Sequence, residues 1–271
     1  MRRSKLTSFN FWYFVIFTAI LYLPILLLII FSFNDATALV FPLESFTTRW
    51  YGEMVRSAEL VGSVWNSIVM GLLSSLVATI LGTMAAIGVV HYKFPGRGVF
   101  VAVAAMPLVI PYVVLAVAML LLFSQFGINL SLWTVGLGHV IINIPLVLLI
   151  VAARLIGMEK NLEEAAMDLG ATYWSTLLRV TLPIAFPAMV AAFLTSFTTS
   201  FDEFALAFFL IGPEPTLPVY ISSQLRFPSR LPIVVTMASV IMVASVLMIV
   251  FSEYVRHWGS APARSRSEGA P

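Results

Sequence analysis

The sequence predicts an all-α integral membrane protein with six transmembrane helices and both termini in the cytoplasm. Of its 271 residues, 60% are hydrophobic and only 10% are charged, and the mean hydropathy is +0.99. Soluble domains are about half apolar and roughly a quarter charged, so this chain could not cover its surface with polar groups. This composition argues against a water-soluble enzyme. The net charge of +2 and the absence of cysteine argue against nucleic-acid binding and against disulfides or thiolate sites.

Six apolar segments reach the length of about 20 residues that a helix needs to cross a bilayer. They lie near residues 11–33, 67–90, 98–123, 131–153, 182–211 and 232–252. Only the fifth contains Asp, Glu, Lys or Arg. We therefore expect a cytoplasmic N-terminus at 1–10, a membrane domain at 11–258 with an outer loop at 34–66, and a disordered cytoplasmic tail at 259–271.

The basic residues indicate the orientation, because Lys and Arg are concentrated in cytoplasmic connections. With both termini inside, 11 of the 15 basic residues lie on the inner side, and Arg49, Arg56, Arg226 and Arg230 lie outside. A cleaved signal peptide is the alternative for the N-terminus. The apolar run 11–33 is much longer than the core of a signal peptide, which favours a retained first helix.

Two patterns concern helix packing. Ser74, Ala78, Gly82 and Ala86 recur every fourth residue and predict a flat seam where the second helix meets a neighbour. In the third and fourth spans, prolines remove backbone donors and are expected to bend their helices. These prolines are Pro107, Pro111 and Pro145.

The connection 154–181 is the longest on the cytoplasmic side. Its apolar positions recur as on one face of a helix, and they are Leu162, Ala165, Ala166 and Leu169. Asn161 is the expected N-cap, Gly170 the expected end, and 173–180 a second short helix. Such an amphipathic helix either docks into a groove of another protein or lies on lipid headgroups.

The order Glu164-Ala165-Ala166, Gly170 and Val180-Thr181-Leu182-Pro183 resembles the EAA motif of permease subunits of bacterial ABC importers. The resemblance implies a type I ABC importer permease fold in the bacterial inner membrane. It also implies a coupling helix that sits in a cleft of the ATPase subunit. The coupling residues carried over by position are Glu164, Ala165, Ala166, Asp168, Leu169, Gly170, Leu182 and Pro183.

The chain itself lacks the Gly-Lys-Ser/Thr of a phosphate-binding loop, since its lysines are Lys5, Lys93 and Lys160. We therefore expect a non-catalytic subunit without a cofactor of its own, whose partner ATPase subunits bind ATP and Mg²⁺.

Asp202 and Glu203 lie inside the fifth apolar segment. A charge near the bilayer centre costs about 2.5–3.5 kcal/mol and usually marks a functional path. The candidates for a cation pathway are Phe201, Asp202, Glu203 and Phe204. Adjacent helical residues lie about 100° apart, so the two carboxylates cannot face one path equally. The alternative is a buried pair that only fixes helix packing.

The wider chain resembles permeases of spermidine/putrescine importers. The matching segments are Ser32-Phe33-Asn34, the run 46–51, Asn66-Ser67 at the expected start of the second helix, and the run 200–204. This resemblance implies a heterodimer with a second permease, two ABC ATPase subunits, an extracytoplasmic substrate-binding protein, and a polyamine as solute. Opines, other amines, ferric iron and phosphonates remain alternative solutes. An ion-coupled secondary transporter and an intramembrane enzyme are the rival classes.

Overall fold

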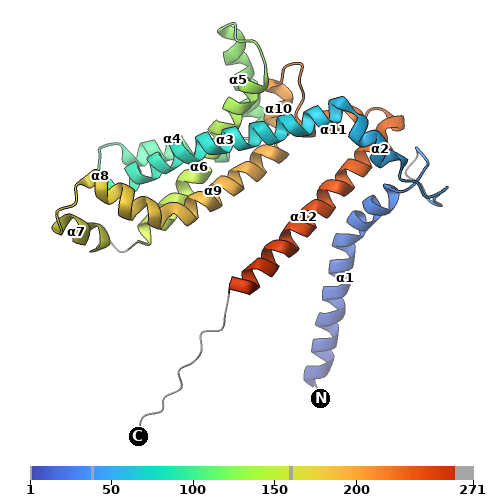
Figure 1. Cartoon of the computed structure of the whole chain (residues 1–271), viewed down its shortest axis with the longest axis horizontal. Coiled ribbons are helices and arrows are strands. Elements are labelled where there is room, and N and C mark those ends of the chain that lie inside the picture. The colour runs from blue at the N-terminus through green and yellow to red at the C-terminus, as the bar shows by residue number, and fades with distance from the viewer. Residues whose placement is uncertain (1, 38–39, 159–160, 260–271) are drawn as a thin grey trace. The chain divides into compact units, whose positions relative to one another are not determined.

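The computed structural model describes residues 2–37, 40–158 and 161–259, and the described residues fold into helices joined by turns (Figure 1). The chain divides into two compact units, 58–223 and a second unit made of 1–57 with 224–271. The prediction of an all-α fold is confirmed. The tail 260–271 and residues 159–160 lie outside the described residues.

The unit 58–223 is built on three long helices that pack side by side, α3, α6 and α9 (Figure 1). In chain order its elements are α3 (Ala58–His91), α4 (Arg97–Val109), α5 (Tyr112–Gln125), α6 (Leu132–Ile156), α7 (Asn161–Asp168), α8 (Tyr173–Thr176), a π-helical turn (Leu177–Thr181), α9 (Leu182–Asp202), α10 (Ala205–Leu210) and α11 (Leu217–Gln224). Small residues allow the three long helices to approach closely.

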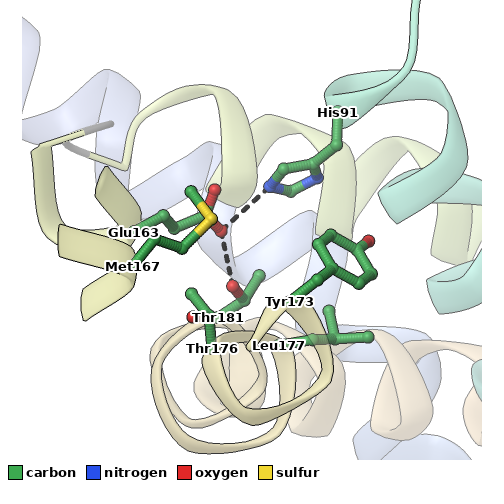
Figure 2. A pocket seen from close by; sticks show the side chains of 7 residues that line it. All are labelled: His91, Glu163, Met167, Tyr173, Thr176, Leu177 and Thr181. Atoms are coloured by element: carbon green, nitrogen blue, oxygen red, sulfur yellow. Dashed lines mark hydrogen bonds and ion pairs between the residues drawn. The ribbon is translucent and has the colours of Figure 1, made fainter. Parts of the chain in front are cut away.

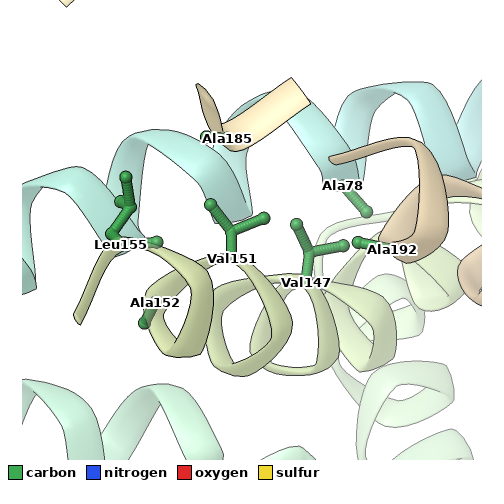
Figure 3. Close-up of a cluster of buried hydrophobic side chains, with 8 residues drawn as sticks. Ala78, Val147, Val151, Ala152, Leu155, Ala185 and Ala192 are labelled. Carbon is green, nitrogen blue, oxygen red and sulfur yellow. The ribbon is translucent and has the colours of Figure 1, made fainter. Parts of the chain in front are cut away.

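The seam predicted on the second helix lies in this core. Ser74, Ala78, Gly82 and Ala86 are all buried on α3, and Ala78 and Ala86 share a cluster with Val147 and Val151 of α6 and with alanines of α9 (Figure 3). A Cβ added at Gly82 would lie 2.6 Å from the Val147 Cβ and 2.9 Å from the Ile144 carbonyl oxygen. The backbones of α3 and α6 therefore meet at a distance that only glycine permits.

We expect Gly82→Ala to destabilise the protein by about 1–3 kcal/mol, the usual cost of overpacking. The matched control is Gly88→Ala on the same helix, where an added Cβ meets nothing within 4 Å and helix propensity favours alanine by up to about 1 kcal/mol. Thermal unfolding of both variants in detergent checks the difference. Equal melting temperatures would contradict the close contact of α3 and α6.

Several boundaries differ from the sequence-based expectations. Asn66 and Ser67 do not open the second helix but lie within α3, which begins at Ala58. The third segment is not one bent helix, because α4 and α5 meet at 105° across Ile110 and Pro111. A proline lacks the backbone donor, which explains the break at Pro111. By contrast, α4 continues through Pro107 and α6 through Pro145.

The fifth segment is also broken. The sequence predicted one helix over 182–211, whereas α9 ends at Asp202 and α10 begins at Ala205. Within the described residues, four helices are long and apolar enough to cross a membrane, and the bent pair α4–α5 is either a broken fifth span or a re-entrant loop. A shorter apolar helical stretch covers Pro228–Ala244. The count of six spans and the cytoplasmic placement of both termini stay predictions.

The second unit contains α1 (Arg2–Phe31), α2 (Arg49–Arg56), a 3₁₀ turn (Pro228–Arg230) and α12 (Leu231–Gly259). The Ser239 hydroxyl of α12 donates to the Leu28 carbonyl of α1 at 3.0 Å. After α1 the chain folds back on itself, and the Trp50 indole donates to the Asn34 carbonyl at 2.8 Å. Two of the segments that carried the family resemblance, 32–34 and 46–51, thus lie in contact.

Candidate functional site

The segment α7 ends in a defined backbone motif at Gly170. The amide of Ala171 donates to the Ala166 carbonyl at 3.0 Å, and the amide of Gly170 donates to the Met167 carbonyl at 2.9 Å. This is the Schellman arrangement, which requires a left-handed residue after the helix. Gly170 supplies it with a φ of +88°, so the predicted break at this glycine is confirmed.

Among the described residues, none covers the outward face of α7. No residue of α7 is buried, Leu162 is 45% exposed, and Leu169, just beyond the helix, is 90% exposed. Glu164, Ala165 and Asp168 are exposed as well, and Ala166 is half-buried. The residues that matched the EAA motif therefore mostly lie on an accessible surface.

Glu163, which the motif does not include, is the acidic residue that faces the protein (Figure 2). Its carboxylate oxygen lies 3.0 Å from His91 Nε2 at the end of α3, and it accepts a hydrogen bond of 2.5 Å from the Thr181 hydroxyl. Met167, one helical turn later, lines the same small cavity. Residues four apart lie on the same face of a helix. The spacing of Glu163 and Met167 could therefore have indicated from the sequence that both face the same side of α7.

The stretch after Gly170 is not the separate short helix that the sequence predicted. The Thr172 side chain accepts a hydrogen bond from the Ser175 amide and caps α8. From there α8, a π-helical turn at Leu177–Thr181 and α9 form a continuous helical run to Asp202. Leu182 and Pro183 begin α9 as expected. Asn161 is the first residue of α7, so it does not occupy the expected cap position.

At the break after α9, the two acidic residues separate. Glu203 is buried, with 7% of its surface exposed, and its Oε2 accepts hydrogen bonds from the amides of Leu206 at 2.8 Å and Ala207 at 3.1 Å. The same oxygen lies 3.7 Å from Nε2 of the buried His139 on α6. A carboxylate is favourable at a helix N-terminus, so Glu203 holds the start of α10.

Asp202, by contrast, is exposed at the end of α9, next to the half-buried Phe201 and the 39% exposed Phe204. Thr195 and Thr198 are exposed on the same helix face as Asp202, since positions seven and four residues earlier lie on one side of a helix. Their hydroxyls donate to backbone carbonyls of α9 and keep their acceptor lone pairs free. Sequence reasoning missed the two threonines, although their spacing was readable.

Hydrogen bonds on the opposite face of α9 tie it to the other long helices. The Ser200 hydroxyl accepts from the Ser74 hydroxyl of α3 at 3.1 Å and from the Asn143 amide of α6 at 2.9 Å. In the part of the chain that the structure describes, His, Asp and Glu side chains form no group that could hold a metal ion. The buried face of α9 thus serves packing, whereas Thr195, Thr198 and Asp202 are exposed.

The comparisons with known proteins agree with this arrangement. Residues 78–258, more than half of the chain, match the family model of the binding-protein-dependent transport system inner membrane component. The chain belongs to this family. As an inner-membrane permease component, it is confirmed as a multi-pass membrane protein of the predicted class.

Two of the curated relatives are permeases of polyamine systems in Escherichia coli (strain K12). The spermidine/putrescine transport system permease protein PotC is 31% identical over 252 residues, 93% of this chain and 92% of PotC. The putrescine transport system permease protein PotI is 34% identical over 214 residues, 76% of each chain. Because these relatives are permease subunits, the expectation of a non-catalytic membrane subunit is confirmed.

Solved structures share the fold. A chain of a bacterial ABC transporter involved in the import of the acidic polysaccharide alginate superposes with a TM-score of 0.68, at 18% identity, over 95% of this permease and 98% of that chain. A chain of the MetNI methionine ABC transporter superposes with a TM-score of 0.59, at 20% identity, over 78% of this permease and 99% of that chain. The predicted ABC importer permease fold is therefore confirmed.

Proposed function

We propose that this permease forms, together with a second related permease, the membrane path of an ATP-driven importer for a small cationic solute of the polyamine class. The observation that carries the proposal is the exposed carboxylate of Asp202 on a membrane helix of a chain homologous to PotC and PotI.

The exposed face of α9 supports the solute class. A carboxylate that faced lipid at the bilayer centre would cost about 2.5–3.5 kcal/mol, whereas one that faces a water-filled path attracts cations. Thr195 and Thr198 add hydroxyl acceptors on the same face, suited to ammonium donors. One carboxylate with neutral acceptors binds weakly enough to release its solute, as transport requires.

A relative from a sulfate transport system sets a useful contrast. The sulfate transport system permease protein CysT of Escherichia coli (strain K12) is 28% identical over 251 residues, 86% of this chain and 87% of CysT. An exposed Asp202 would repel a divalent anion, so this residue argues for the cationic alternative. Opines, other amines and ferric iron remain testable competitors.

The exposed face of α7 supports the proposal that ABC ATPase subunits are partners of this chain. Glu164, Ala165 and Leu169 are exposed, so the described residues of the chain leave their side chains accessible to a partner. We assign them to the groove of an ABC ATPase subunit, two copies of which bind ATP and Mg²⁺ and supply the energy. An extracytoplasmic binding protein delivers the solute. Closure of the ATPase pair then moves α7, and the membrane helices alternate between outward and inward openings.

Uptake of labelled spermidine and putrescine by the complete transporter in proteoliposomes tests this function. We expect uptake that requires internal ATP and the binding protein and that survives collapse of the proton and sodium gradients. Uptake that persists without the ATPase and stops with an ion gradient would identify a secondary transporter instead. Competition by unlabelled opines, ferric iron, phosphonate and sulfate ranks the other solutes.

A further inference from the structure

The docking segment α7 makes few contacts that could fix it to the membrane helices. A helix of eight residues is not stable alone in water, and α7 buries none of its residues. Between α7 and the ends of α3 and α6 lies a cavity of about 460 Å³, lined in part by Val90, Lys93, Leu155 and Glu164. Packing between α7 and the ends of those two helices is therefore interrupted by this cavity.

Glu163 bridges this gap. Its carboxylate oxygen is shared between His91 Nε2 on α3 and the Thr181 hydroxyl at the base of α9. Among the described residues of α7, Glu163 is the one whose side chain bonds to a membrane helix. The sequence separations are 72 and 18 residues. A hydrogen bond to an ionised acceptor is roughly twice as strong as a neutral one.

The local backbone is shaped to make this bridge. Thr181 ends a π-helical turn at Leu177–Thr181, and such turns occur often at functional sites. In a regular helix, residues five apart differ by about 140° around the axis. The wider turn brings the buried Thr176 and Thr181 to the same side, where both line the cavity around Glu163 (Figure 2).

We propose that Glu163, His91 and Thr181 form a clasp that transmits the movement of α7 to α3 and α9, and that Glu163 is its positioning residue. The proposal rests on the proposed function, because it requires an ATPase that moves α7. In the clasp, Glu163 makes no contact with the ATPase. Glu164, one position later, is exposed, and we assign it to docking. In this proposal, the Glu164 carboxylate binds the ATPase, and the Glu163 carboxylate transmits the movement of α7 to the membrane helices.

The test uses the complete transporter with its binding protein in proteoliposomes, and it measures ATPase co-purification, ATP turnover and solute molecules imported per ATP. We expect Glu163→Ala to retain the ATPase and hydrolyse ATP while the solute imported per ATP falls roughly tenfold. Glu163→Gln keeps an acceptor for Thr181 and is expected to fall between Glu163→Ala and the unmodified protein. Unchanged import per ATP, or loss of the ATPase from the complex, would overturn the clasp.

A second variant keeps the test valid if Glu163→Ala folds poorly. The chain has no cysteine, so the pair His91→Cys with Glu163→Cys can be joined by a short bifunctional thiol reagent. We expect the reduced pair to be uncoupled and the crosslinked pair to regain import per ATP, with each single variant unresponsive to the reagent. A crosslinked pair that stays uncoupled contradicts the clasp. Failure of the unmodified protein to bind an ATPase contradicts the proposed function instead.

Discussion

Glu164→Arg should abolish the association of this permease with its ATPase subunit. Glu164 is exposed on α7 and has no partner among the described residues of its own chain, so reversal of its charge acts on the interface and not on the fold. Placing a like charge or an unpaired charge in an interface costs about 2–5 kcal/mol. We expect association at least roughly a hundredfold weaker, measured by co-purification of the ATPase from detergent-solubilised membranes.

The matched control for this variant is Glu214→Arg, the same charge reversal at an exposed carboxylate between α10 and α11. It should leave ATPase co-purification unchanged. Normal membrane insertion of both variants excludes misfolding as the cause. If Glu164→Arg retains the ATPase as well as the control does, α7 is not the docking element.

Asp202→Asn should reduce polyamine uptake roughly tenfold, since removal of one charge from a cation site corresponds to about 1.4 kcal/mol or more. The side chain is exposed and its size changes little, so assembly and ATPase association should persist. Uptake of labelled putrescine, compared at equal amounts of assembled complex, measures the effect. Asp202→Glu should restore part of the uptake.

The neighbouring Glu203 serves as the contrast. Glu203→Gln keeps an oxygen that can accept from the amides of Leu206 and Ala207, so it should keep the break before α10 and most of the uptake. Glu203→Ala should lower thermal stability, because it leaves two buried amides without an acceptor. Normal uptake by Asp202→Asn together with strongly reduced uptake by Glu203→Gln would exchange the two roles.

Several features were predictable because they depend on residue size or on local backbone chemistry. The four small residues of the second helix are buried as their spacing predicted, and Gly170 ends α7 with the positive φ that favours glycine. Both features depend on residues close together in the sequence. The arrangement of the helices in space was predicted by the family resemblance, because hydropathy alone predicts only a set of apolar helices.

The break after Asp202 and the inward position of Glu163 were not predictable in the same way. Hydropathy treats 182–211 as one apolar run, and it does not register that a buried carboxylate such as Glu203 requires donors that an uninterrupted helix lacks. In the EAA segment, the motif includes Glu164 and not Glu163, so it predicted a functional role for Glu164 alone. The positions of His91 and Thr181, 72 and 18 residues away in sequence, show which of the two carboxylates is held by the chain.

The π-helical turn at Leu177–Thr181 also sets the relative azimuth of what lies on either side of it. A chain with one residue fewer in this turn could form a regular helix. The helix α8 before the turn would then be rotated by about 100° about the helix axis and shifted by about 1.5 Å along it. Tyr173 would move away from Tyr92, whose ring centroid lies 6.3 Å from its own, while α9 kept its orientation. The single additional residue therefore sets the rotation of α8 relative to α9.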